Sequence, residues 1–165
     1  MGFQPDLSDA GPPESTNWLR HHHFGVGETV TAPDGSPGRQ LVRGTWNTAI
    51  IDELAPEPHD TIIDKHRFSG FYETDLDAEL RQRGVTQLVF TGWTTSVCVE
   101  STIRDAMFRN YRCVVLEDCT AEPIGNTLPR TNHEATLLVV ERLFGWVARS
   151  SDLITAIEEV ALTSA

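Results

Sequence analysis

The amino-acid sequence predicts an α/β fold built on a mostly parallel β-sheet, and two observations indicate it. Short runs rich in Val, Ile and Leu alternate along the chain with amphipathic stretches of about ten residues, which is the pattern of β-α-β units. These runs are apolar throughout rather than alternately polar, as strands are when a sheet is covered on both faces. In open sheets of this kind, ligands bind at the carboxyl ends of the strands, so candidate functional residues are sought there.

The first 45 residues lack this regularity. Residues 1–45 contain turn-forming residues throughout, as in Gly11-Pro12-Pro13 and the stretch APDGSPG at 32–38. We predict loops with one short helix here. Because loops this long are uncommon inside a compact domain unless they are functional or peripheral, we interpret the segment as a lid, an interface arm or the remainder of a truncated element.

More regular elements are predicted from residue 46 onward. The apolar spacing over residues 46–54 predicts a short amphipathic helix. The run 61–63, TII, predicts a short buried strand that ends at Lys65. Thr74 is the expected N-cap of a further helix, which Gly84 is expected to stop.

The second half of the chain carries the clearest pattern. It predicts strands over 87–91 and 113–117, helices over 97–109 and 133–144, a short strand at 146–147 and a last helix over 151–160. The helix over 97–109 has one apolar face, formed by Val99, Ile103, Ala106 and Met107. Ser151 or Asp152 is expected to cap the last helix.

Length and charge limit the class of protein. A chain of 165 residues fits one domain, over 1–165. Its 24 acidic and 13 basic residues give a formal net charge of −11, which argues against a nucleic-acid or membrane-surface partner because both present anionic groups. No apolar run approaches the roughly 20 residues that span a bilayer. The three cysteines are an odd number without the spacing of a disulfide framework, so a cytoplasmic chain with free thiols is expected.

Two residues at predicted strand ends could carry chemistry. Cys98 follows the second predicted strand at the start of a helix, where unpaired backbone N–H groups and the helix dipole favour a thiolate and can hold a developing oxyanion. Lys65 ends the neighbouring strand, and its ammonium would stabilise that thiolate further. The simpler alternatives are a buried, unreactive cysteine and a solvated lysine. The occurrence of both residues at adjacent strand ends favours the functional interpretation.

The segment around Cys98 resembles a known family. Residues 92–106, GWTTSVCVESTIRDA, are similar to the nucleophile segment of the isochorismatase-like cysteine hydrolases. The resemblance extends upstream through 64–71, DKHRFSGF, and downstream through the strand at 114–118, VVLED. Within the family it looks most like the ureidoacrylate amidohydrolase branch, over roughly residues 41–160. The resemblance implies a Rossmann-like three-layer α/β/α fold, no cofactor, a small-molecule amide or ureido substrate and a homo-oligomer.

The same resemblance implies roles for individual residues. Cys98 would be the nucleophile that forms a thioester acyl-enzyme, and Lys65 the lysine of the catalytic triad. The backbone N–H groups of Thr94 and Cys98 would form the oxyanion hole, after a cis peptide bond between Trp93 and Thr94. The implied pocket residues are Phe68, Ser69, Phe71 and Trp93. Core packing is an equally good interpretation of Phe71 and Trp93, as it is of Trp46.

One element of the family pattern is not found before Lys65. The family has a catalytic Asp at the end of its first strand, where it acts as general base. Here Asp6 and Asp9 lie in an expected loop and Asp34 in a Pro/Gly turn. We therefore expect that the first strand-helix-strand unit is missing from this chain. The accompanying hypothesis is that the chain as given is inactive although it belongs to a hydrolase family.

Three alternatives are kept open. Cys98 and Arg104 have the Cys-x5-Arg spacing of cysteine phosphatases, but the five residues between them include no Gly and place Glu100 where a phosphate would bind. The run at 21–23, HHH, could suggest a metal site, although consecutive histidines cannot all face one ion on a regular element, and no metal is expected. A non-catalytic oligomeric or binding protein that keeps the fold is the third alternative.

Overall fold

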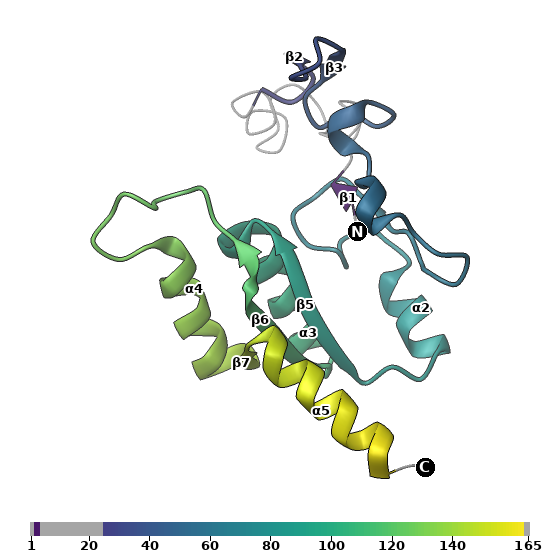
Figure 1. The fold of residues 1–165 in the computed structure, drawn as a ribbon, viewed down its shortest axis with the longest axis vertical. Coiled ribbons are helices and arrows are strands. Elements are labelled where there is room, and N and C mark those ends of the chain that lie inside the picture. The colour runs from purple at the N-terminus through teal and green to yellow at the C-terminus, as the bar shows by residue number, and fades with distance from the viewer. Residues whose placement is uncertain (1, 4–24, 164–165) are drawn as a thin grey trace. The chain divides into compact units, whose positions relative to one another are not determined.

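The computed structural model describes residues 2–3 and 25–163 (Figure 1). The chain divides into two compact units, Met1–Thr74 and Asp75–Ala165, and each is considered by itself. The assignment of residues 1–165 to one domain stays a prediction. In the described part of the chain, no helix is long and apolar enough to cross a membrane.

The first unit contains two pairs of short strands. β1 (Gly2–Phe3) pairs in parallel with β4 (Asp64–Lys65), and β2 (Thr29–Thr31) pairs antiparallel with β3 (Pro37–Arg39). The turn between β2 and β3 is closed by Asp34, whose carboxylate accepts hydrogen bonds from the Ser36 N–H and hydroxyl at 2.9 and 2.6 Å. The prediction of loops missed this hairpin, because strands of three residues are too short to show a period of two. The placement of Asp34 in a turn is confirmed.

Two further predictions in the first unit are wrong, the second of them only in part. The segment 46–54 forms two separate 3₁₀ turns, Trp46–Thr48 and Asp52–Leu54, rather than one helix. The chain leaves helical geometry at Ala49, whose φ of −70° and ψ of 146° are extended, so the two turns stay separate. The strand predicted over 61–63 does end at Lys65 as expected, but its pairing begins only at Asp64, and Ile62 is 58% exposed whereas Ile63 is buried.

The second unit is a three-stranded parallel sheet with its helices, as predicted (Figure 1). The strand order is β5-β6-β7, with β5 at Gln87–Trp93, β6 at Arg112–Ala121 and β7 at Trp146–Ala148. The helices are α2 (Leu76–Gln82), α3 (Glu100–Phe108), α4 (Asn132–Val139) and α5 (Ser150–Thr163). Thr95–Val99 and Val140–Phe144 are π-helical segments that are continuous with α3 and α4. The predicted α/β class with a parallel sheet is therefore confirmed.

The helix ends differ in detail from the predictions. Thr74 does not cap α2, because its hydroxyl donates to the Gly70 carbonyl at 2.6 Å. Gly84 does end that helix, with a φ of +66° that few other residues adopt. The last helix begins at Ser150, one residue earlier than predicted. Asp152 lies in the first turn of this helix, and its carboxylate accepts a hydrogen bond from the Arg149 N–H at 3.1 Å.

The core of the second unit lies between α3 and the sheet. Ile103 and Ala106 on α3 are completely buried, and Cys113 and Val115 on β6 are 1% exposed. The Cys113 thiol contacts the Ile103 carbonyl at 3.8 Å, which places this face of β6 against α3. α5 crosses the other face of the sheet (Figure 1), so the unit has helical layers on both sides.

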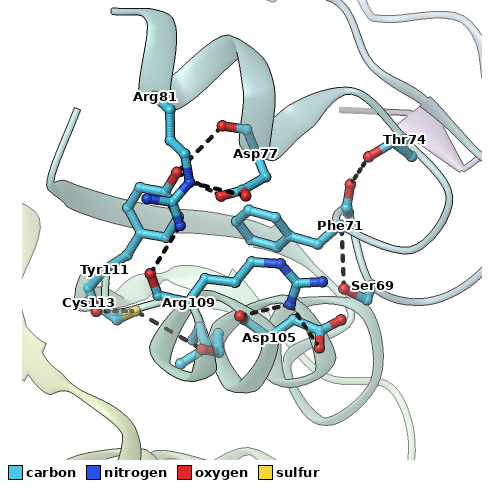
Figure 2. Close-up of polar contacts among 11 residues, drawn as sticks. Ser69, Phe71, Thr74, Asp77, Arg81, Asp105, Arg109, Tyr111 and Cys113 are labelled. Atoms are coloured by element: carbon cyan, nitrogen blue, oxygen red, sulfur yellow. Dashed lines mark hydrogen bonds and ion pairs between the residues drawn. The ribbon is translucent and has the colours of Figure 1, made fainter. Parts of the chain in front are cut away.

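A polar contact ties α2 to the start of β6 (Figure 2). The buried Tyr111 hydroxyl donates to the Asp77 carboxylate at 2.8 Å, and Arg81 donates to the same carboxylate at 3.0 Å. The hydrogen bond from Arg81, followed by that from Tyr111, holds the pKa of Asp77 below its ordinary value. Arg81 also donates to the Arg109 carbonyl at the end of α3, so this cluster joins three segments of the unit.

We expect Tyr111→Phe to lower the free energy of unfolding by about 1 kcal/mol, because a buried hydrogen bond to a carboxylate is lost while the ring stays in place. Urea denaturation measures the change. Tyr72→Phe is the matched control, since that ring is 43% exposed, and its effect should stay within about 0.5 kcal/mol. A Tyr111→Phe variant as stable as the unmodified chain would contradict the prediction.

Candidate active site

Cys98 lies where the central crossover of the second unit begins. β5 ends at Trp93, and the Trp93–Thr94 peptide bond is cis, as the family resemblance implies. Gly92 precedes it with a φ of +113°, which glycine adopts readily. The π-helical segment Thr95–Val99 then carries Cys98, whose side chain is half-buried. We call residues 94–99 the nucleophile turn.

Backbone hydrogen bonds define the shape of the nucleophile turn. The Thr94 carbonyl accepts from the N–H groups of Val97 and Val99 at 3.1 and 3.2 Å. The Thr102 hydroxyl donates to the Cys98 carbonyl at 2.6 Å, one turn further along the helix. The thiol is thus carried by a short helical start at the carboxyl end of a parallel strand, where this class of sheet binds its ligands.

A buried carboxylate holds the same turn from the end of β6. Glu122 is 6% exposed, and its Oε2 accepts a hydrogen bond from the Ser96 N–H at 2.7 Å. Its other oxygen accepts from the Ile124 N–H at 2.9 Å. The sequence analysis missed Glu122. The available signal was its position directly after a buried strand, at the sheet edge where functional residues are expected.

Thr95 forms a second link between the nucleophile turn and its surroundings. Its buried hydroxyl donates to the Ala121 carbonyl at 2.9 Å and lies 3.0 Å from Nδ1 of His133. A hydroxyl has one proton to donate, so the His133 Nδ1 must carry a proton and donate to Thr95. A capping box formed by Thr131 and Glu134 begins α4 and so places His133 in its first turn. That T-x-x-E pattern is readable in the sequence.

Glu100 and Arg104, one turn apart on α3, form an ion pair. Arg104 Nε donates to Glu100 at 2.9 Å, and the guanidinium lies 4.1 Å from the centre of the Phe144 ring. The other oxygen of Glu100 accepts from the Thr136 hydroxyl at 2.9 Å, which joins α3 to α4. Because Arg104 is engaged with a carboxylate along a helix, the arrangement differs from a phosphatase loop that wraps a phosphate.

The remaining predicted site residues lie in the first unit. Lys65 is 4% exposed, and its ammonium donates to the carbonyl groups of Arg67 and Phe68 at 2.9 and 3.1 Å. These bonds fold the segment after β4 around the lysine. Ser69 and Phe71 are also buried, and the Ser69 hydroxyl accepts from the Phe71 N–H at 3.1 Å (Figure 2).

The predicted residues therefore fall into two groups. Lys65, Phe68, Ser69 and Phe71 are brought together in the first unit, and Trp93, Thr94 and Cys98 in the second. Phe68 is 41% exposed and Trp93 70% exposed. This exposure makes core packing a poor explanation of Trp93. The catalytic, oxyanion-hole and pocket roles of these residues stay predictions.

The other candidates from the sequence lie outside the described residues or form contacts elsewhere. Asp6, Asp9 and the run at 21–23 lie outside the described residues. His66 is held by Glu73 at 3.0 Å, in an exposed pair. Among the residues that the structure describes, no group of three or more His, Cys, Asp or Glu side chains could hold a metal ion.

A cavity of about 360 Å³ lies at the opposite end of the sheet, lined by Met107, Tyr111, Arg112, Cys113, Glu141, Arg142, Leu143, Phe144, Gly145 and Trp146. β6 and β7 begin at Arg112 and Trp146, so this is the amino edge of the parallel strands. Burial raises the pKa of the Cys113 thiol there to about 11, so this thiol stays protonated at neutral pH. The cavity therefore offers no reactive thiol, and the carboxyl edge with Cys98 remains the candidate site.

Comparison with known proteins agrees with this geometry. Residues 18–152 match the Isochorismatase domain family. The chain is 42% identical over 160 residues to the ureidoacrylate amidohydrolase RutB of Agrobacterium fabrum, covering 97% of this chain and 67% of that protein. In the ureidoacrylate amidohydrolase RutB of Methylobacterium radiotolerans, 44% identical over 147 residues, the chain covers 54% of the relative.

Solved structures show the same likeness. A cysteine hydrolase from Pseudomonas syringae pv. phaseolicola has a TM-score of 0.74 at 28% identity, over 95% of this chain and 70% of that one. N-carbamoylsarcosine amidase from Thermoplasma acidophilum has a TM-score of 0.60 at 36% identity, over 68% of this chain and 61% of that one. With a family match over most of its length and a cysteine at the turn after β5, this chain belongs to the isochorismatase family of hydrolases.

Proposed function

We propose that this chain carries the nucleophile of a cysteine hydrolase that cleaves an amide or ureido C–N bond of a small molecule. The hypothesis that the chain as given is inactive, because the general base of the family is not found before Lys65, is tested by the same hydrolysis assay. The observation that carries the proposal is the position of Cys98, half-buried in the helical turn that follows the carboxyl end of β5. The names of two similar proteins, ureidoacrylate amidohydrolase and N-carbamoylsarcosine amidase, both describe substrates with a ureido group. A small ureido acid is therefore the substrate class to test first.

The proposed reaction uses the thiol and one water molecule. A general base takes the proton of the Cys98 thiol, and Sγ attacks the carbonyl carbon to form a tetrahedral adduct. The C–N bond then breaks, the amine leaves with a proton, and a thioester remains on Cys98. Water attacks this thioester, releases the acid and restores the thiol. Dividing the hydrolysis in this way replaces one difficult step with two easier ones.

Backbone and side-chain groups are assigned to the remaining roles from the family resemblance. The N–H groups of Thr94 and Cys98 would stabilise the oxyanion, because preorganised donors at a helix start meet charge as it develops. Lys65 would act as the cationic member of the catalytic triad. Lys65 is 4% exposed, and burial of a lysine costs free energy because its charge leaves water. That cost supports a specific role for this residue. Pocket roles are assigned to Phe68, Ser69, Phe71 and Trp93.

The same resemblance supports proposals about assembly and location. We propose a homo-oligomer, in which α5 provides contact surface between copies, because Ile154, Ile157 and Val160 on successive turns are 56%, 60% and 63% exposed. We also propose a cytoplasmic location. The three cysteines are free thiols, and the cytoplasm keeps thiols reduced.

We expect Cys98→Ser to lower the rate of ureido-acid hydrolysis by about 10³-fold or more, because a serine hydroxyl lacks the nucleophilicity of the thiolate at neutral pH. Ammonia or amine release is measured over a panel of ureidoacrylate, an N-carbamoyl amino acid, a nicotinamide-type amide and an aryl phosphate. The exposed Cys119→Ser is the matched control and should keep full activity. Equal turnover by both variants would contradict the assignment, and preferential hydrolysis of the aryl phosphate would favour the phosphatase alternative.

Cysteine alkylation tests the site without a substrate. At neutral pH and without denaturant, iodoacetamide should modify Cys98 but leave Cys113 unmodified, since a thiol with a pKa of about 11 carries almost no thiolate there. Mass spectrometry of the Cys-containing peptides measures each rate. If Cys98 is labelled only in denaturant, it is a buried structural cysteine and the proposed role is wrong.

We expect Ile157→Glu to shift the chain toward smaller species, because a charge on an apolar contact surface opposes association. Sedimentation velocity measures the distribution. Glu158→Gln on the same helix is the control. A chain that is monomeric before substitution would rule out the proposed assembly.

A further inference from the structure

The strongest feature that the proposed reaction leaves unexplained is the buried carboxylate of Glu122. A buried carboxylate is costly unless its charge is well solvated by hydrogen-bond donors. Glu122 is 6% exposed, and each of its oxygens accepts from a backbone N–H, one in the nucleophile turn and one in the loop after β6. The side chain therefore joins two segments that are 26 residues apart in the sequence.

The position of the Ser96 N–H explains why the turn needs this acceptor. The first N–H groups of a helical segment have no carbonyl partner within that segment. Ser96 is the second residue of the π-helical segment, so its N–H is one of these donors. A carboxylate at this point satisfies the donor and interacts favourably with the positive end of the segment. Cys98 follows two residues later on the same turn.

A second interaction fixes the adjoining residue. The Thr95 hydroxyl is bound between the Ala121 carbonyl and the His133 ring. Consecutive residues of the nucleophile turn are thus attached to consecutive residues at the end of β6. The Glu122 bond is the shorter, at 2.7 Å, and is charge-assisted.

We propose that Glu122 is a positioning residue that holds the nucleophile turn, and with it the Cys98 thiol, in the geometry needed for attack. The inference rests on the proposed function of Cys98 and adds a role for a residue that does not touch the substrate. Holding matters because a displacement of about 1 Å at a reacting atom can lower a rate about 100-fold.

Glu122→Gln is the test variant, and Glu117→Gln is its matched control. Gln keeps the volume of the side chain and one acceptor oxygen, but its NH₂ group faces the second N–H, so one of the two bonds is lost. Glu117 lies on β6, the strand that Glu122 follows, and undergoes the same chemical change, but its partner is Arg149 at the surface. Thermal unfolding of both variants reports whether the fold is retained. Should Glu122→Gln fail to fold, Thr95→Ser and Thr95→Val provide the same comparison at the adjoining link.

The first measurement is amide hydrogen exchange, which needs no substrate. We expect exchange across residues 94–100 to accelerate about 10-fold or more in Glu122→Gln, with the rest of the sheet unchanged and Glu117→Gln like the unmodified chain. Unchanged exchange in this segment, or acceleration spread over the whole second unit, would overturn the proposal.

The second measurement separates positioning from stability. With a ureido acid that the unmodified chain hydrolyses, kcat should fall about 10- to 100-fold in Glu122→Gln while KM changes less than about 2-fold. A rise in KM with an unchanged kcat would overturn the positioning role. If the unmodified chain hydrolyses none of the substrates, the proposed function fails, and the exchange measurement still decides the role of Glu122.

Discussion

The parallel pairing of β5 with β6 is the constraint on which the rest of the second unit depends. Two adjacent parallel strands can be joined only by a crossover, and here that crossover is the nucleophile turn and α3. The helix must therefore start at the carboxyl end of β5 and return along the face of the sheet. Burial of Ile103 and Ala106 against β6 holds it there, and this packing brings Cys98 to the carboxyl edge.

Polar contacts then complete what the apolar core begins. Packing of α3 determines its direction, but it does not determine the conformation of the residues before its first regular turn. Contacts from the end of β6 and the start of α4 hold that conformation: the Glu122 carboxylate accepts from the Ser96 N–H, and the His133 ring lies against the Thr95 hydroxyl. The network from Thr136 through Glu100 to Arg104 sets α4 against α3 in the same way. The buried side chains of Glu122 and Thr95 thus hold both the fold of this region and the turn that carries the candidate nucleophile.

Sequence patterns predicted the elements of the second unit well and those of the first unit poorly. The apolar runs at 87–91 and 113–117 are long enough to identify strands, and the helices beside them show clear amphipathic spacing. In the segment 46–54 the same spacing was misleading, because Ile51 and Leu54 remain 60% and 70% exposed and no α-helix forms. Apolar spacing predicts a helix only when tertiary packing buries that face, and here the backbone becomes extended at Ala49 and separates two 3₁₀ turns.

By itself, the sequence determined the α/β class, the parallel sheet, the family and the identity of the candidate nucleophile, because these depend on periodicity and on a contiguous motif. Only the tertiary structure decided which residues hold that nucleophile. Glu122 and His133 lie 24 and 35 residues beyond Cys98 in the chain, and no local pattern links them to it. The Glu122 contact exists because parallel pairing brings the end of β6 beside the end of β5, and the His133 contact because α4 begins beside the nucleophile turn. A site formed at the ends of several strands depends on contacts between residues that are distant in the sequence, and these contacts form only when the whole unit folds.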